Sequence, residues 1–256
     1  MPRALRLSIL ASLFFAAANC LIAQQPATPT SVLSGALTVM GGANVQAISL
    51  TGTAESSTGS SSDTGSFTGS CNTAGSSQLS LQLSGGSLTE NRQTTNGAPN
   101  GSWVDSAGTQ HAMVQHNLYT SSSWFCPVIA LTQLVSSSAP NIQFIGEEQK
   151  NGAALDHFTT TTAQANTGAP YTLATHLSQV DIYLNPQTQM PVVFDFTIHP
   201  DSDAGTDIPI EIQFSNYTQA NGVWIPFTVQ KYINSTLVLT LQVQSASIGS
   251  ATSKNQ

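Results

Sequence analysis

The feature that most constrains the fold is a C-terminal stretch, residues 180–243, in which apolar and polar side chains alternate. A period of two places every second side chain on the same face of a β-strand. Polar turns separate five such runs, so the pattern predicts an antiparallel sheet with one apolar and one polar face. The expected inward-facing residues are Val180, Ile182 and Leu184; Val192, Phe194, Phe196 and Ile198; Ile208, Ile210, Ile212 and Phe214; Val223, Ile225, Phe227 and Val229; and Leu237, Leu239, Leu241 and Val243.

Earlier segments extend the sheet and add helices. We expect strands in 47–54, around 67, in 79–83 and 88–93, near Trp103 and Met113, and in 142–148 and 154–160. The Ser- and Gly-rich run 55–65 is predicted to be a mobile hairpin loop. Apolar residues at helical spacing predict a helix over 31–40, capped by Thr30 or Ser31 and ended by Gly41-Gly42. A second helix over 124–136, capped by Ser123, is apolar on nearly all sides and therefore expected to be buried.

These elements predict a mainly β (α+β) fold. Leaving the apolar face of the sheet open would cost tens of kcal/mol, at about 1.5–3 kcal/mol for each large side chain. Strands and helices do not alternate along the chain, which argues against a parallel sheet. We therefore expect a curled antiparallel sheet of roughly 11–12 strands, an incomplete β-barrel, covered by two or three short helices. One domain spans 30–248, between a flexible leader (24–29) and a disordered tail (249–256).

The N-terminus resembles a secretory signal. Residues 1–23 combine Arg3 and Arg6 with an apolar run and end at the small residue Ala23. Lipidation at Cys20 and an uncleaved anchor are alternatives. We expect a secreted, periplasmic bacterial protein with no transmembrane segment in its mature chain. An oxidising compartment permits a disulfide between Cys71 and Cys126, and two separate buried thiols are the alternative.

The charge balance excludes one class of partner. Without residues 1–23, four basic residues remain against thirteen acidic ones, a formal charge of −9. Nucleic acids are bound mainly through neutralisation of their phosphates, so a nucleic-acid partner is not expected. Charged residues make up only 7% of the chain, against about 25% in ordinary soluble domains. Polar uncharged side chains must therefore supply the solubility, and we expect a monomer.

At this point the sequence resembles a known family. Three stretches, 144–156, 180–192 and 214–227, resemble the strand–turn–strand segments of the LolA/LolB-like superfamily of periplasmic lipoprotein carriers. The resemblance covers about residues 30–248. It implies an incomplete barrel whose helices cover a hydrophobic cavity able to hold acyl chains. Those carriers use an arginine near the lid, and Arg92 is the single arginine after residue 23, but no individual functional residue is carried over.

The sequence contains no recognised catalytic motif, and we expect neither an enzyme nor a cofactor. The five histidines are scattered, and no metal site is expected from His111 and His116. Asp201, Asp203 and Asp207 surround a glycine in a loop that could collect Ca²⁺, although a polar hairpin loop explains the same residues.

The apolar stripe is the feature with functional potential. It predicts either a filled core or a core that also holds a ligand cavity, a common arrangement in the mouths of β-barrels. Our first hypothesis is a binding protein that shelters an acyl chain or a lipoprotein lipid. The second is a non-enzymatic cell-envelope structural or interaction domain with a filled core, contacted at an edge strand or at 55–65. The candidate cavity residues are Leu37, Met40, Trp103, Met113, Leu131, Phe144, Phe194, Phe196, Ile212, Phe214, Ile225, Phe227, Leu239 and Leu241.

Overall fold

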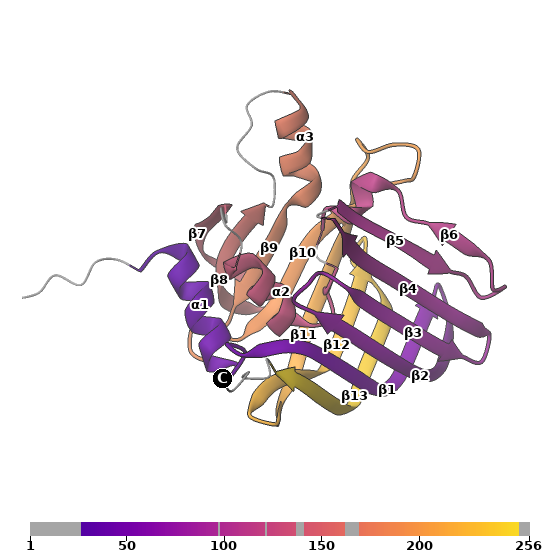
Figure 1. The fold of residues 1–256 in the computed structure, drawn as a ribbon, viewed down its shortest axis with the longest axis horizontal. Helices are drawn as coiled ribbons and strands as arrows, with labels where there is room; N and C mark the ends of the chain where they lie inside the picture. Colours follow the sequence, from indigo (N-terminus) through magenta and orange to yellow (C-terminus); the bar gives the residue numbers. More distant parts are fainter. Residues whose placement is uncertain (1–26, 97, 121, 137–140, 162–168, 251–256) are drawn as a thin grey trace, which may run out of the picture.

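The computed structural model describes residues 27–250 apart from 97, 121, 137–140 and 162–168. The expected signal peptide (1–23), half of the leader (24–29) and most of the tail (249–256) lie outside these residues. The described part forms one 13-stranded antiparallel sheet (Figure 1). Its strands are β1 (Val45–Thr58), β2 (Ser61–Asn72), β3 (Ser77–Leu83), β4 (Gly86–Thr95), β5 (Ala98–Val104), β6 (Gln110–Ala112), β7 (Asn141–Lys150), β8 (Ala153–Thr161), β9 (Val180–Leu184), β10 (Pro191–Ile198), β11 (Ile208–Ala220), β12 (Val223–Ile233) and β13 (Thr236–Ser250).

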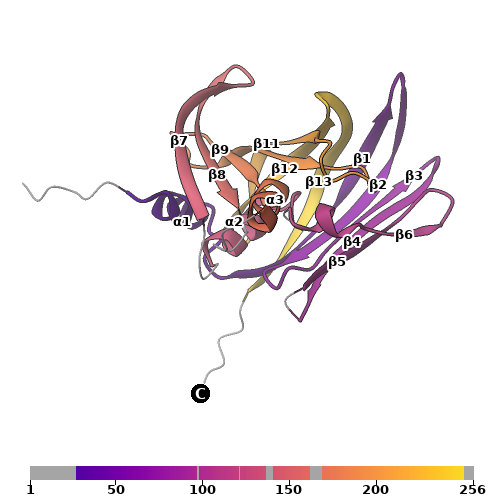
Figure 2. The ribbon, with the colours of Figure 1, turned by 90° about the horizontal axis from the view of Figure 1, so that it is seen from above.

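The pairing of the first and last strands determines the shape of the sheet. The strand order is β6-β5-β4-β3-β2-β1-β13-β12-β11-β10-β9-β8-β7, so β1 pairs with both β2 and β13. The chain therefore builds two meanders that meet at the β1–β13 seam, and β6 and β7 are the two edges. Figure 2 shows these two meanders, a first arm of β1–β6 and a second arm of β7–β13, curling toward each other without closing. This confirms the expected incomplete barrel, with slightly more strands than predicted.

Three α-helices accompany the sheet: α1 (Pro29–Val39), α2 (Pro127–Val135) and α3 (Ala169–Ser178). A short 3₁₀ helix, η1 (Gln115–Leu118), precedes α2. Figure 2 shows α2 between the two arms of the sheet. Val128, Ile129 and Leu131 are completely buried, as its all-round apolar sequence predicts. No helix in the described ranges is long and apolar enough to cross a membrane.

Helix α1 packs against α2 and contributes Leu33, Ala36 and Leu37 to the core. Its predicted N-cap was wrong: the helix begins at Pro29, and the Thr28 side chain accepts a hydrogen bond from the Ser31 amide. The predicted stop agrees with the structure, since the helix ends at Val39 and Gly41 follows with a φ of +72°. Pro29 has no amide hydrogen to lose, which favours this start. The Ser123 cap of the second helix was also wrong, because α2 begins at Pro127 after Cys126.

The predicted loop at 55–65 was wrong as well. It consists of the ends of β1 and β2, joined at residues 59 and 60. Each of these Ser- and Thr-rich ends is paired through its backbone: Ser56 lies opposite Asp63 in β2 and Leu239 in β13. Backbone pairing over this length overrides the weak strand propensity of the composition.

The outer face of the second arm is not uniformly polar, although the alternating sequence pattern predicts a polar outer face. Val193 is completely buried, and it packs with Leu155 and Tyr183 in a small second cluster. The His157 ring stacks on Tyr183 at 4.4 Å between centroids, and Lys150 lies 5.2 Å from the centroid of the same ring. Burial, with the nearby Asp195 charge, raises the pKa of Tyr183 to about 12.

Candidate functional site

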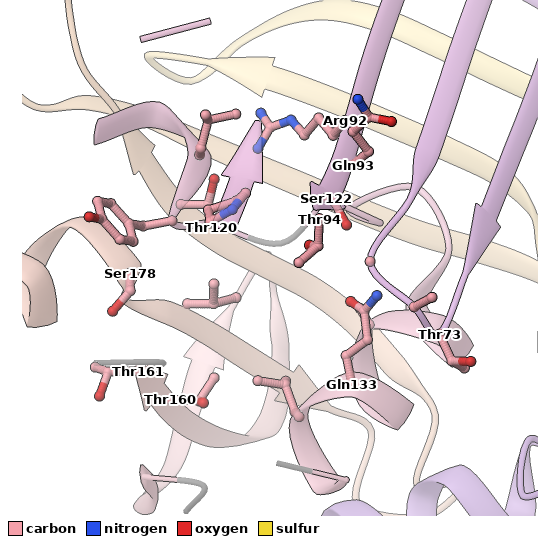
Figure 3. Close-up of a pocket in the computed structure, with 18 of the residues that line it drawn as sticks. Thr73, Arg92, Gln93, Thr94, Thr120, Ser122, Gln133, Thr160, Thr161 and Ser178 are labelled. Atoms are coloured by element: carbon pink, nitrogen blue, oxygen red, sulfur yellow. The ribbon is translucent and has the colours of Figure 1, made fainter. Parts of the chain in front are cut away.

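The concave face of the sheet holds a cavity of about 330 Å³ beside α2. Its walls come from the ends of β4, β5, β8 and β9 and from the segment before α2. Figure 3 shows Arg92 and Gln93 on one side of the cavity and Thr160 and Thr161 on the other, with Gln133 of α2 between them. The cavity therefore lies where the two arms of the curled sheet face each other.

The lining of this cavity combines apolar and polar side chains, and several of the polar ones, such as Thr160 and Ser178, are buried. Leu134 and Ala130 of α2 face Val180, Ile182 and Phe194 on the opposite arm. A ligand that fits such a site has a hydrocarbon part and a polar end. The polar lining residues are Thr73, Arg92, Gln93, Thr94, Asn100, Thr120, Ser122, Gln133, Thr160, Thr161 and Ser178.

A covalent link holds α2 in its place between the arms. Cys71 of β2 is bonded to Cys126, the residue directly before α2. The Gln133 side chain adds a second link, since its Nε2 donates to the carbonyl of Asn72 at 3.0 Å. The helix that forms one wall of the cavity is thus attached to the sheet at both ends.

Three partly buried charged side chains, Glu90, Arg92 and Lys231, lie on the same concave face. Arg92 Nε is 2.9 Å from Glu90 Oε1, and an Arg92 amino group donates to the carbonyl of Asn117 at 3.2 Å. Lys231 of β12 approaches from the other arm, with its Nζ 4.8 Å from the centroid of the Trp124 ring. Opposite charges held in a mostly apolar interior interact more strongly than in water.

The pKa directions in this charged group follow from burial and pairing. Burial raises the pKa of Glu90, but the charges of Arg92 and Lys231, with hydrogen bonds from Arg92 and Trp124, outweigh it and hold that pKa below its usual value. Burial lowers the pKa of Lys231, and the attraction of Glu90 opposes only part of this shift. Glu90 is therefore ionised at neutral pH and compensates two cations.

A second cavity of about 340 Å³ lies on the other side of Arg92. Glu90, Arg92 and Lys231 face it together with Trp124 and a set of apolar side chains. Arg92 thus lines both cavities and separates them. The apolar residues of the second cavity are Leu79, Leu81, Leu88, Trp103, Val104, Met113, Val114, Ile198 and Leu239.

The structure distributes the predicted cavity residues unevenly. Phe194 lines the first cavity, and Trp103, Met113 and Leu239 line the second. Phe144, on the edge strand β7, is 50% exposed, because an edge strand has a neighbour on one side only. Phe227 is half-buried against the core. The other members pack in the continuous core: Leu37, Met40, Leu131, Phe196, Ile212, Phe214, Ile225 and Leu241.

The aspartate loop after β10 is held by its own hydrogen bonds. Asp203 accepts from the amide of Gly205 at 2.9 Å and from the hydroxyl of Thr206 at 2.6 Å, and these bonds lower its pKa. Asp201 faces the second cavity, and Asp207 accepts from His176. The three carboxylates thus have separate surroundings, and the calcium site considered from the sequence stays a prediction.

His111 and His116 likewise have separate partners. His111 stacks on Trp103 and bonds to Asp105, whereas His116 bonds to the carbonyl of Pro200.

Sequence reasoning missed two parts of the site. Glu90 and Lys231 were not singled out, because they are far apart in sequence and meet only across the curled sheet. Charged residues at inward positions of their strands, beside Leu88 and Val229, were the available signal. Helix α3 was not predicted at a defined position, although Leu173 and Leu177 have helical spacing.

Comparison with known proteins agrees with this architecture. No protein-family model matches the sequence, and no curated protein sequence matches it. Solved structures, three of which are described below, are similar over most of the chain. A structure described as an outer membrane lipoprotein-sorting protein domain from Vibrio parahaemolyticus has a TM-score of 0.51 and 11% identity, covering 88% of this chain and 94% of the other.

A LolA superfamily protein from Nitrosomonas europaea has a TM-score of 0.51 and 10% identity, with 88% and 96% covered. A DUF1329 family protein from Desulfovibrio piger has a TM-score of 0.52 and 11% identity, with 87% and 94% covered. The unclosed sheet wrapped around internal helices defines a half-barrel protein. Its fold is LolA-like, as the three sequence stretches indicated.

Proposed function

We propose that this protein is a periplasmic binding protein that shelters a hydrophobic ligand, an acyl chain or the lipid of a lipoprotein, inside its half-barrel. The observation that supports this most directly is the cavity of about 330 Å³ between α2 and the two arms. Pockets for small molecules typically measure about 300–1,000 Å³ and combine apolar walls with a few polar groups. The role is binding rather than catalysis.

The chemistry of the cavity supports an amphipathic ligand. Each methylene group that leaves water for the wall formed by Ala130, Leu134 and Phe194 contributes about 0.8 kcal/mol. The lining also offers hydroxyl, amide and guanidinium groups, Arg92 among them, to an ester or an anionic headgroup. A second cavity across Arg92 provides space for a further chain.

The N-terminal sequence and the Cys71–Cys126 bond support export to an oxidising compartment. The similarity to a lipoprotein-sorting domain, at 11% identity, supports the half-barrel fold, and the proposed ligand class rests on the cavity itself. We propose that the protein acts as a monomer on a lipid cargo.

A second candidate function is a structural or interaction domain of the cell envelope with a filled core. Ten of the fourteen candidate cavity residues are buried in the core, and this favours the filled-core function. The exposed Phe144 and Ile145 on edge strand β7 would then contact a partner. The run at 55–65, part of two paired strands, is not a free loop for such a partner.

Native mass spectrometry distinguishes the two candidates. Protein isolated from a periplasmic fraction without detergent is expected to carry one lipid mass per chain, released by organic extraction. A fluorescent fatty acid added to delipidated protein is expected to bind in a saturable manner. Protein that is consistently empty and does not bind the fatty acid would favour the filled-core function.

A further inference from the structure

Two histidines and an aspartate that are scattered in the sequence meet at one end of the barrel. His176 Nε2 is 2.8 Å from Asp207 Oδ1, and His199 Nδ1 is 3.4 Å from the same oxygen. The potential ligand atoms of the three residues all lie within 4.8 Å of one another. Among the described residues, this is the one group of three or more histidine, cysteine, aspartate or glutamate side chains with such geometry.

The β10–β11 hairpin brings two of these residues together. Ile198 and Ile208 are paired across the two strands, so His199 and Asp207 come directly after and directly before the last pair. They therefore face each other at the base of the loop. The third residue, His176, lies in the last turn of α3, and its ring centroid is 5.6 Å from that of His199.

The surroundings hold His199 in a defined orientation. Its side chain is completely buried, its backbone amide donates to Asn117 Oδ1 at 2.8 Å, and its carbonyl accepts from Asn117 Nδ2 at 2.8 Å. The far ring nitrogen is 3.5 Å from the hydroxyl of Thr197. Such support for a ligand by neighbouring groups is typical of protein metal sites.

The spacing of the group fits a small divalent ion. Zinc binds histidine nitrogens at about 2.0–2.1 Å and carboxylate oxygens at about 2.0–2.2 Å in tetrahedral geometry, which places ligand atoms about 3.3 Å apart. The two distances to Asp207 Oδ1, 2.8 and 3.4 Å, bracket that value. The carbonyl of Thr206, 3.1 Å from His199 Nδ1, is a nearby oxygen donor.

The group is also accessible from solvent. His176 and Asp207 both line an open cavity of about 530 Å³ on the outer face, into which Asp181, Asp195 and Glu211 also face. Lys150 lines the same cavity and neutralises part of this charge, since its Nζ lies 2.6 Å from Asp195 Oδ2 and 2.7 Å from Glu211 Oε2. An imidazole–carboxylate donor set favours Zn²⁺, Cu²⁺, Ni²⁺ and Co²⁺ over Ca²⁺ or Mg²⁺.

We propose that His176, His199 and Asp207 form a binding site for a divalent transition-metal ion of the Zn²⁺ type. In the metal-bound state each imidazole is neutral, binds the ion through His176 Nε2 or His199 Nδ1, and carries its hydrogen on the other ring nitrogen. Three protein ligands leave a fourth position, which faces the open cavity. Binding also cross-links α3 to the β10–β11 hairpin. This site is separate from the cavities inside the barrel and does not depend on their ligand.

Calorimetric titration with ZnCl₂ tests the proposal. The purified protein, without a polyhistidine tag and stripped with EDTA, is expected to bind one Zn²⁺ per chain. His176→Gln is expected to weaken binding by at least about tenfold. Its side chain is 44% exposed, so the variant is expected to keep the wild-type fold, which circular dichroism checks. His111→Gln, which removes an exposed histidine paired with Asp105, is the matched control and is expected to bind like wild type.

Co²⁺ supplies an independent readout. The visible absorption of the Co²⁺-loaded wild type is expected to report histidine coordination, and His176→Gln and Asp207→Asn are both expected to remove it. Absence of Zn²⁺ binding by the wild type would overturn the proposal. So would unchanged Zn²⁺ affinity in His176→Gln, because the ion would then be held elsewhere.

Discussion

Cys71 of β2 is bonded to Cys126, the residue directly before α2, so a covalent bond joins the wall of the half-barrel to the helix inside it. The two cysteines are 55 residues apart in sequence. The bond also bears on the cavity, since Ala130 and Leu134 of the attached helix form its wall.

Replacing both cysteines by serine is expected to lower the free energy of unfolding by about 4 kcal/mol, the chain-entropy value for a loop of this length. Urea denaturation measures the change. Wild-type protein reduced with dithiothreitol is the control and is expected to match the double variant. A double variant as stable as the oxidised wild type would show that the bond does not constrain the unfolded chain.

Glu90→Gln tests the charged group inside the barrel. The variant leaves Arg92 and Lys231 without their anion, and we expect a loss of about 1.5–3 kcal/mol, the range for hydrogen bonds to charged groups. Glu55→Gln, on an exposed position of β1, is the matched control with an expected change near zero. Equal stabilities of the two variants would contradict the role of Glu90.

The same residue predicts part of the acid sensitivity. The pKa of Glu90 is lower in the folded protein than its usual value, so the unfolded state takes up the proton more readily. Its stabilising contribution is complete above the unfolded pKa of about 4.3 and is lost as the pH falls through the folded pKa. Between about pH 5 and pH 3, the unfolding free energy of wild type is expected to fall more steeply than that of Glu90→Gln. Parallel profiles would argue against this assignment.

Gly41 connects α1 to β1 and tolerates no side chain. Its φ is +72°, and an added Cβ would lie 2.3 Å from the carbonyl oxygen of Gly222. Gly41→Ala is expected to cost about 1–3 kcal/mol from backbone strain, with the steric clash in addition. Gly108, at φ +83° with open space around it, is the matched control for strain alone. Thermal unfolding should therefore show a larger loss for Gly41→Ala than for Gly108→Ala.

Filling the cavity tests the proposed function. Leu134→Trp places a larger side chain in the wall of the cavity beside α2, and we expect binding of a fluorescent fatty acid to weaken at least about tenfold. Overpacking costs about 1–3 kcal/mol, so thermal unfolding must show that the variant is folded. Val39→Trp, at a 43% exposed position of α1, is the control and is expected to bind normally. Normal binding by Leu134→Trp would show that the ligand binds outside this cavity.

Local pattern was sufficient for much of the fold. Ile182, Phe194 and Ile212 were expected on one face from alternation alone, and they lie side by side, buried, across β9, β10 and β11. The buried helix α2 follows in the same way from its all-round apolar sequence. Period and composition determine such features because each depends on neighbours a few residues away.

The sequence by itself thus determined a curled, mainly β protein with a buried helix and one apolar face. Only the tertiary structure decided which residues line the cavities and which form the proposed metal site. Edge placement exposes Phe144, and the curl of the sheet brings Lys231 to Glu90 across more than a hundred residues of chain. The β10–β11 hairpin and α3 likewise bring His176, His199 and Asp207 together. Periodicity specifies the face on which a side chain lies, whereas contacts between distant segments depend on how the strands pair and curl.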